Sequence, residues 1–407
     1  MRSGRKQRIK WGGFNCRIWL GALFCASIIQ GCRVDQEQPS SLEVVFELND
    51  SVQARFPVQV NGLMFTLENG SELIRMPKVN EGIYRVPVFG GGWIFDESDD
   101  SNSGFWVDSL RPPRGGQHYR VDFMLNEAVR SESSDSILPG TWDLWFDTEN
   151  VSEAAESQLD LWNEPGGVGG TVRTPTGDYR FLSGTFRNDS LVLQTFDGAH
   201  LYRFDAILSG GQWKSGRFFS GNHYHTAWVG HQAKKWVDDE SITSLHVEVD
   251  SLFVRIIDRD GRATQLSLQP APGHVTVLDV LGTWCPNCMD EVRLLKSIPQ
   301  DHLNILSVAF ERDTIPSRAY QRIDQYAIEF DASWPFYLGG KANKQVAAAA
   351  FPFLDQVLSF PTTLFIQHDG TVHVHSGFNG PATGTLYELE KSRFQNLAQA
   401  TTSLENH

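Results

Sequence analysis

The stretch Trp284-Cys285-Pro286-Asn287-Cys288 decides the fold of the last third of the chain. It follows an apolar, β-branched run at residues 275–281 that ends at Gly282, and it precedes a run of helical periodicity at residues 289–298. This order predicts a buried strand, a turn with two cysteines, and a helix. A helix that begins at the first cysteine points its free N–H groups at that sulfur and stabilises the thiolate. The spacing therefore favours reversible thiol–disulfide chemistry.

Three other interpretations of the two cysteines stay open, namely an inert structural disulfide, half of a zinc site, and a chance spacing. A zinc site needs further soft ligands at suitable spacing. A disulfide across so short a loop would constrain the unfolded chain very little. The residues downstream help to separate these possibilities.

A second buried strand is predicted at residues 303–309 and a helix at 316–328, with proline in its first turn. A further strand opens with Phe360-Pro361-Thr362-Thr363. Proline is tolerated at such a position, although it removes one ladder donor. The chain therefore continues as an α/β domain after the cysteines.

With both motifs in order, residues 269–407 resemble a thioredoxin-superfamily domain, most similar to the TlpA-like thiol-disulfide oxidoreductases. The resemblance implies an α/β thioredoxin-like fold at the C-terminus. It also implies that Cys285 is the attacking thiolate, that Cys288 resolves the mixed disulfide, and that Pro361 is a cis-proline facing them. The Cys285–Cys288 disulfide would be the redox centre, with no other cofactor. An ordinary trans proline at a strand start is the alternative for Pro361.

The same resemblance implies a substrate-binding surface around the two cysteines. Phe360 would pair its backbone with an extended substrate segment. The residues expected on this surface are Trp284, Pro286, Asn287, Phe360 and Pro361.

Two acidic residues are candidates for proton transfer. Asp279 lies in the apolar strand, six residues before Cys285, where the resemblance implies a buried acid. Burial raises the pKa of a carboxyl group, so we expect Asp279 to be the base for Cys288. A carboxylate that reaches solvent at the sheet end is the alternative. Glu291 matches the acidic residue that the family places near its cysteines, and it would tune their reactivity.

The helix after the cysteines departs from the family in one place. The family usually has a proline two residues after the acid, and this chain has Arg293. Asp290 is expected to be a solvated helix charge. Because Asn287 carries no charge and two acids are near, we expect a reductant or an isomerase rather than a strong oxidant.

The N-terminus predicts export. Six cations and no acid precede an apolar stretch at residues 18–29, which is too short for a comfortable membrane span. Residues 29–32 resemble a bacterial lipobox, so residues 1–31 would be a lipoprotein signal peptide, Cys32 the lipidation site and residues 32–42 the anchor and linker. Ordinary cleavage that leaves Cys32 free is the alternative. After Cys32 the chain has only Cys285 and Cys288, as suits an oxidising compartment.

Charge and compartment limit the partners. Without the six cations of the leader, 29 basic residues face 49 acidic ones. This excess of negative charge disfavours nucleic-acid binding and broad docking on anionic lipid. We expect a bacterial envelope protein that faces the periplasm from either membrane, with exported disulfide-containing proteins and a membrane or periplasmic electron donor as partners.

The region before residue 269 reads as all-β. Short strands separated by Gly and Asn turns predict one β-rich domain at residues 43–135 and a meander or barrel-like domain at 136–268, as a sandwich, a small barrel or both. The second domain contains several tryptophans that could line a ligand pocket, although core packing is the commoner role of such residues. They are Trp142, Trp145, Trp162, Trp213 and Trp228.

Two histidine pairs have the alternating spacing of strand-borne metal ligands. They are His223 with His225, and His373 with His375. Because neither has an obvious thiol or carboxylate partner, we predict no metal site.

The sequence therefore predicts an envelope thiol-disulfide oxidoreductase that reduces or isomerises disulfides of exported proteins through Cys285 and Cys288. A thiol peroxidase of the same fold is one alternative, although its usual Pro-x-x-x-Thr-x-x-Cys pattern is absent. A β-domain binding lipoprotein with a secondary redox unit is the other alternative.

Overall fold

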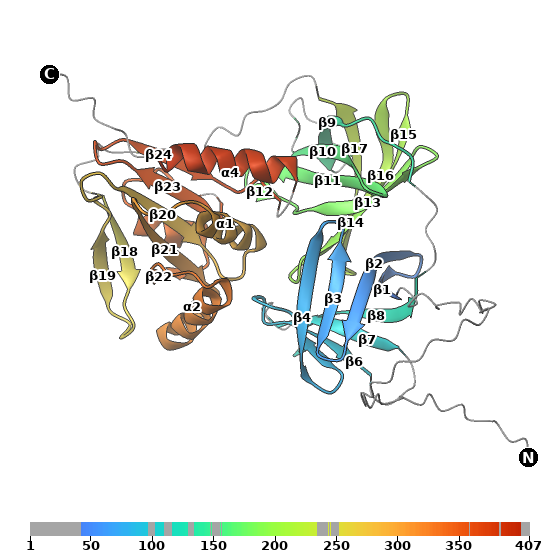
Figure 1. Cartoon of the computed structure of the whole chain (residues 1–407), viewed down its shortest axis with the longest axis horizontal. Helices are drawn as coiled ribbons and strands as arrows, with labels where there is room; N and C mark the ends of the chain where they lie inside the picture. Colours follow the sequence, from blue (N-terminus) through green and yellow to red (C-terminus); the bar gives the residue numbers. More distant parts are fainter. Residues whose placement is uncertain are drawn as a thin grey trace, which may run out of the picture. The chain divides into compact units, whose positions relative to one another are not determined.

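A computed structural model of the whole chain is shown in Figure 1. It describes residues 42–96, 102–109, 116–128, 134–146, 148, 155, 157–233, 243, 245, 252–357, 359–381 and 384–399. All of these belong to one compact unit, Ser40–His407. The predicted signal peptide and the lipidation site Cys32 lie outside the described residues. None of the helices within the described residues is long and apolar enough to cross a membrane.

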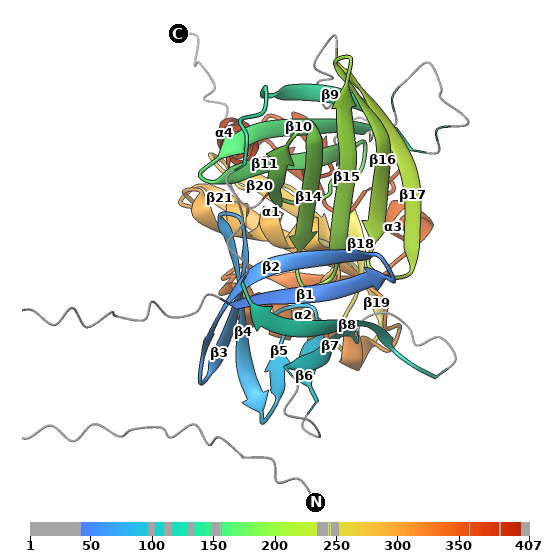
Figure 2. The ribbon, with the colours of Figure 1, turned by 90° about the vertical axis from the view of Figure 1, so that its right-hand side faces the viewer.

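The first β region is a closed barrel of eight antiparallel strands. Figure 2 shows β1 between β2 and β8, the pairing that closes the ring. Alternate residues of β2 point into the barrel, which is the period expected of a strand with one buried face. The strands are β1 (Leu42–Asn49), β2 (Val52–Asn61), β3 (Met64–Asn69), β4 (Glu72–Asn80), β5 (Ile83–Arg85), β6 (Gly92–Phe95), β7 (Ser103–Asp108) and β8 (Tyr119–Glu127).

The second β region is also a closed ring of eight strands, because β10 pairs with both β9 and β11. A short ninth strand, β12, pairs with the end of β11. The strands are β9 (Gly140–Phe146), β10 (Ser157–Glu164), β11 (Gly167–Thr174), β12 (Gly177–Asp178), β13 (Leu182–Arg187), β14 (Ser190–Phe196), β15 (Leu201–Ser209), β16 (Gln212–Ser220) and β17 (Tyr224–Gln232). Both predicted β domains are thus barrels, and the sandwich alternative is wrong for the strands described.

The tryptophans of the second barrel are mainly core residues. Trp213 and Trp228 are fully buried, and Trp142 and Trp145 are nearly so. Trp213 packs edge-on against Trp142 with the ring centroids 5.8 Å apart. These contacts give them the packing role that the sequence left open.

The third sheet has seven strands in the order β19-β18-β22-β21-β20-β23-β24. Its three central strands β20, β21 and β22 are parallel. β23 is antiparallel to β20, and β24 is antiparallel to β23. The strands are β18 (Phe253–Ile257), β19 (Ala263–Ser267), β20 (Val275–Leu281), β21 (Leu303–Glu311), β22 (Phe336–Lys341), β23 (Thr362–Ile366) and β24 (Val372–Ser376). The hairpin of β18 and β19 pairs with β22, so this sheet begins before the predicted domain start at residue 269.

Four helices lie within the described residues. Successive side chains of β20 point to opposite faces of the sheet, and each face packs against its own apolar layer. Val277 and Leu281 face the layer that contains α1 and α2, whereas Leu278 and Val280 face the layer that contains α3. Asp279 is in phase with Val277, so its carboxyl group lies on the α1 side of the sheet. The helices are α1 (Pro286–Ser297), α2 (Pro316–Phe330), α3 (Lys344–Ala350) and α4 (Thr385–Leu397).

Candidate dithiol site

The two cysteines lie at the start of α1, and both are free thiols. Cys285 is the N-cap residue, and its Sγ accepts a hydrogen bond from the backbone N–H of Cys288 at 3.3 Å. Pro286 follows at the first helical position, where its missing N–H costs nothing. A sulfur in this position lies at the positive end of the helix dipole, which favours the thiolate form.

The accessibility of the two sulfurs is unequal. Cys285 keeps 6% of its surface exposed, whereas Cys288 is completely buried. Burial, followed by the neighbouring Cys285, raises the pKa of the Cys288 thiol well above its usual value. Near neutral pH Cys288 is therefore a protonated thiol that needs a base before it can attack.

The loop before β23 supplies the second contact of Cys285. Its thiol donates a hydrogen bond to the carbonyl oxygen of Phe360 at 3.2 Å. The peptide bond between Phe360 and Pro361 is cis, as the resemblance implies. The Trp284 ring packs edge-on against Phe360 at 5.7 Å, and the Arg312 guanidinium lies 4.8 Å from the centre of the Trp284 ring. Trp284, Phe360 and Pro361 thus lie next to Cys285 or to the carbonyl oxygen that it contacts.

The predicted burial of Asp279 is confirmed, since its side chain has no exposed surface. Its Oδ2 accepts a hydrogen bond from the Ser307 hydroxyl at 2.8 Å. Burial raises the pKa of Asp279 to about 7, while hydrogen bonds from Ser307 and Glu291 act in the opposite direction. A carboxyl group with this pKa can both accept and release a proton near neutral pH.

Glu291 is fully buried on the same helix as the cysteines, and it accepts a hydrogen bond from the Thr363 hydroxyl. Burial raises the pKa of Glu291 well above its usual value, and the charge of Asp279 raises it further. Two carboxyl groups that interact this closely titrate as a pair. The charge of Asp279 also raises the pKa of the Cys288 thiol, so the two acids and the buried thiol interact.

The turn before the cysteines is held by two charged residues that were not among the predicted site residues. The Glu311 carboxylate accepts hydrogen bonds from the backbone N–H of Thr283 at 3.0 Å and from its hydroxyl at 2.8 Å. Arg322 donates to the carbonyl oxygen of Thr283 at 3.1 Å. Glu311 ends β21, and an acid at the carboxyl end of a strand beside the motif is the signal that could have identified it.

The two middle residues of the motif contact the second barrel. The Arg180 guanidinium donates to the carbonyl oxygen of Pro286 at 3.1 Å. The Asn287 amide donates to the backbone carbonyl oxygens of Asp178 at 3.1 Å and Phe378 at 3.2 Å. Pro286 and Asn287 were expected to face substrate. In this structure the carbonyl oxygen of Pro286 and the side-chain amide of Asn287 instead form hydrogen bonds with other residues of the same chain.

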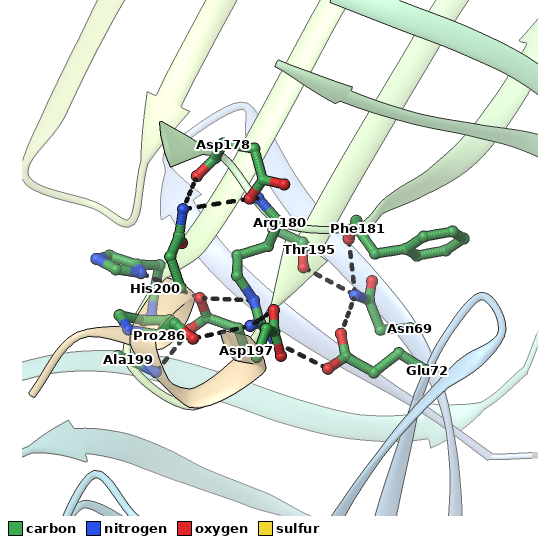
Figure 3. Close-up of polar contacts among 12 residues, drawn as sticks. Asn69, Glu72, Asp178, Arg180, Phe181, Thr195, Asp197, Ala199, His200 and Pro286 are labelled. Atoms are coloured by element: carbon green, nitrogen blue, oxygen red, sulfur yellow. Dashed lines mark hydrogen bonds and ion pairs between the residues drawn. The ribbon is translucent and has the colours of Figure 1, made fainter. Parts of the chain in front are cut away.

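Asp290 corrects a second expectation. It was predicted to be a solvated helix charge, but it is 1% exposed and forms an ion pair with Arg180. Burial also raises the pKa of the neighbouring Asp178 to about 8. In both cases residues 178–180 of the second barrel contact the start of α1. Figure 3 shows Arg180 of this segment joined to Pro286.

The four histidines of the two pairs lie in different surroundings. His375 is buried and pairs with Glu390, whereas His373 is exposed. His223 packs edge-on against Tyr119, and His225 stacks on Phe219. Within the residues that the structure describes, no group of three His, Cys, Asp or Glu side chains is arranged to hold a metal.

Comparisons with known proteins give the following likenesses. No protein-family model matches the chain. The thioredoxin-like protein YneN of Bacillus subtilis is 25% identical over 126 residues, which cover 31% of this chain and 66% of that protein, just under two thirds of its length.

Two solved structures are also similar. The thioredoxin-family thiol:disulfide interchange protein of Chlorobium tepidum is 17% identical over 39% of this chain and 100% of that one, with a TM-score of 0.25. The exposed lipoprotein thioredoxin Etrx1 of Streptococcus pneumoniae is 18% identical over 36% of this chain and 97% of that one, with a TM-score of 0.23. The chain is thus similar to thioredoxin-like proteins over about a third of its length.

Proposed function

We propose that this protein is a thiol-disulfide oxidoreductase and that residues 252–399 are its thioredoxin-like domain. One observation carries the proposal. Cys285 caps the first turn of α1 with its sulfur between the N–H of Cys288 and the carbonyl oxygen of Phe360, while Cys288 lies buried one turn further on. A structural disulfide needs no such asymmetry between its two sulfurs.

The reaction follows from that asymmetry. The Cys285 thiolate attacks one sulfur of a substrate disulfide, so that a mixed disulfide forms and the first substrate thiolate leaves and takes up a proton. Cys288 then loses its proton and attacks the Cys285 sulfur. The second substrate thiolate leaves, and the protein keeps the Cys285–Cys288 disulfide. The two electrons now on the substrate came from the dithiol, and the reverse sequence oxidises a substrate dithiol.

The proton of Cys288 needs an acceptor inside the protein, because this thiol has no exposed surface. Asp279 fills this role in the proposal, since its charge acts on Cys288 and its pKa is about 7. Glu291 would set the proton affinity of Asp279 through their mutual interaction. Both acids disfavour extra negative charge on the sulfurs, which supports reduction or isomerisation over strong oxidation.

The cellular setting is also part of the proposal. A lipid on Cys32 would tether the protein to the bacterial envelope, where its substrates would be exported proteins with disulfides. A membrane or periplasmic dithiol donor would return two electrons to the Cys285–Cys288 disulfide after each reductive cycle, since the periplasm has no thiol buffer of its own.

The reduction potential of the dithiol tests the proposal. The full chain is equilibrated in defined thiol–disulfide buffers, and the oxidised fraction of Cys285 and Cys288 is read from alkylated peptides by mass spectrometry. We expect reversible titration towards the value of thioredoxin, about -270 mV, whereas a value near that of DsbA, about -120 mV, would make the protein an oxidant. A pair that does not titrate reversibly would refute the redox function.

Two further measurements separate the alternatives. Consumption of hydroperoxide by Cys285 would support the thiol peroxidase. A variant in which Ser replaces both Cys285 and Cys288 serves as the blank in each assay. If that variant keeps the cellular role of the protein, the barrels carry the main function as a binding module.

A further inference from the structure

A buried ion cluster connects the dithiol helix to both barrels. Its centre is Arg180, which lies between β12 and β13 and is 1% exposed. The guanidinium pairs with Glu72 at 2.9 Å, with Asp197 at 3.7 Å and with Asp290 of α1. Figure 3 shows the Glu72 and Asp197 side chains pointing toward the Arg180 guanidinium, beside Pro286. Glu72 belongs to the first barrel, Asp197 to the second and Asp290 to α1, so a single cation joins both barrels and the dithiol helix.

The cluster holds a loop against the start of α1. Residues 177–180, here called the covering loop, contact Asn287 through the Asp178 carbonyl oxygen. The Asp178 N–H donates to the carbonyl oxygen of Phe378 at 3.2 Å, which fixes the loop on the far side of Asn287 as well. Gly177 lies so close that a Cβ atom on it would be 2.5 Å from the Asn287 amide nitrogen. The loop and α1 are therefore in direct contact, with no room for another chain between them.

The opposite side of Cys285 has a different character. Trp284 and Phe360 are half-buried, and Arg312 above Trp284 is exposed. The polar contacts of the covering loop go to α1, to Phe378, to its own barrel and to the acids of the ion cluster, so its position is explained without Trp284 or Phe360. An incoming disulfide therefore reaches Cys285 from the side of Trp284 and Phe360.

We propose that the covering loop is a specificity-determining wall of the dithiol site, held in place by Arg180. It closes the Asn287 side of Cys285, so that the site takes disulfides that are small or that project from a protein surface, and excludes broad protein segments. This inference rests on the proposed redox function, because a wall beside Cys285 selects substrates only if Cys285 reacts with disulfides. Whether the covering loop restricts access can be measured on the Cys285 thiol without any substrate. Arg180 is a positioning residue here, because it acts through Pro286, Asp290 and the loop.

The chemistry of the cluster explains why the wall stays closed. Separation of the loop from α1 would leave the buried carboxyl group of Asp290 with only the exposed Arg293, 3.3 Å away on the same helix, as its counter-charge. Leaving one member of a buried pair unpaired is strongly destabilising, whereas the intact network is tolerated. The planar guanidinium contacts several acceptors at once, a geometry that a lysine ammonium cannot reproduce. Arg180 is thus suited to hold loop and helix together.

The test measures access to the Cys285 thiol with two reagents of the same chemistry and different size. Reduced full-length protein is treated with N-ethylmaleimide or with a maleimide on a 5 kDa polyethylene glycol. Loss of the unmodified Cys285 peptide is followed by mass spectrometry. The ratio of the two rate constants, large reagent over small, reports how open the site is, and the small reagent corrects for any change in thiol reactivity.

Two variants open the wall in different ways. Arg180→Met removes the cation, and Gly177→Ala inserts a methyl group against Asn287 without a change of charge. We expect each to raise the ratio about tenfold, the change in open population that follows a loss of about 1.4 kcal/mol of contact free energy. Reduction of insulin relative to a small aromatic disulfide should rise in parallel. Arg180→Lys should lie between wild type and Arg180→Met, since the charge returns without the planar geometry.

Arg173→Met is the matched control. Arg173 is a buried cation of the same barrel that pairs with Asp160 and has no role at α1 in the proposal. Its loss should weaken the barrel and leave the ratio unchanged. An unchanged rate ratio in Gly177→Ala and Arg180→Met, or an equal rise of the ratio in Arg173→Met, would refute the proposal that the covering loop restricts access to Cys285. A higher rate ratio in both loop variants, together with a dithiol that does not titrate reversibly, would support the covering loop as a barrier to access. The same result would refute the redox function.

Discussion

The Arg180 guanidinium donates a hydrogen bond to the carbonyl oxygen of Pro286 at 3.1 Å, so a residue of the second barrel touches the middle of the Cys-x-x-Cys motif. The two residues are 106 positions apart in the chain. The barrels are therefore more than a spacer before the redox domain, because one of their loops forms part of the surroundings of Cys285. The covering loop of the second barrel and the Cys-x-x-Cys motif are linked through this contact.

The unequal burial of the two sulfurs predicts which single variant traps a substrate. In Cys288→Ser the mixed disulfide on Cys285 cannot be resolved, so a protein with a surface disulfide should stay covalently attached. In Cys285→Ser the remaining thiol is fully buried, and the yield of trapped complex should be at least about tenfold lower, in line with the dependence of exchange on access. Non-reducing gels measure the yield. Equal trapping by both variants would contradict the assigned roles.

Asp279→Asn tests the proposed proton acceptor of Cys288. Resolution of the mixed disulfide should slow about a hundredfold near pH 7, the usual scale of a general-base contribution. The difference from wild type should shrink as pH rises, because Cys288 then ionises without help. Rapid-quench measurements across pH 6–9 give this profile. Asp160→Asn, which changes a buried aspartate of the second barrel, is the control, and a similar slowing there would remove the special role of Asp279.

Stability should fall as pH rises from about 4 to about 8. The folded-state pKa is about 7 for Asp279 and about 8 for Asp178, both far above the usual aspartate value. In this window the native state keeps protons that the unfolded chain releases, so the free energy of unfolding decreases with pH by about 1.4 kcal/mol per pH unit for each such proton. Urea denaturation at several pH values measures the slope. Asp279→Asn should flatten it, and an unchanged slope would show that Asp279 does not retain its proton.

The chemistry near Cys285 was predictable because its signals are local. The buried run at residues 275–281 became β20, and the acid within it became a fully buried carboxyl group. The helical periodicity at 289–298 begins three residues after the first helical residue, Pro286, because the N-cap is Cys285 itself, as expected of a helix that begins at the first cysteine. A periodic pattern of apolar residues cannot reveal that start, since the first turn of this helix is defined by backbone geometry and the sulfur.

The wall over Asn287 could not be predicted, because its contacts join distant parts of the chain. Arg180 and Asp290 are separated by 110 positions, and Arg180 and Glu72 by 108. Each of these charges, taken alone in the sequence, is typical of a solvated surface. The start of the third sheet was placed too late for a similar reason. The hairpin β18–β19 has the same short alternation as the barrel strands, and only its pairing with β22 assigns it to the other sheet.

His375→Ala distinguishes a structural histidine from a metal ligand. His375 is buried, pairs with Glu390 and packs edge-on against Phe394 with the ring centroids 5.1 Å apart. Its loss leaves a buried carboxyl group without its partner, which should cost about 2 kcal/mol of unfolding free energy. His373→Ala, two residues away on the same strand, removes an exposed ring and should change stability by less than about 0.5 kcal/mol. Denaturant titrations with and without a chelator make the comparison. Equal losses in the two variants, or a loss that the chelator reproduces in the wild-type protein, would favour a metal site at this strand over the buried pair.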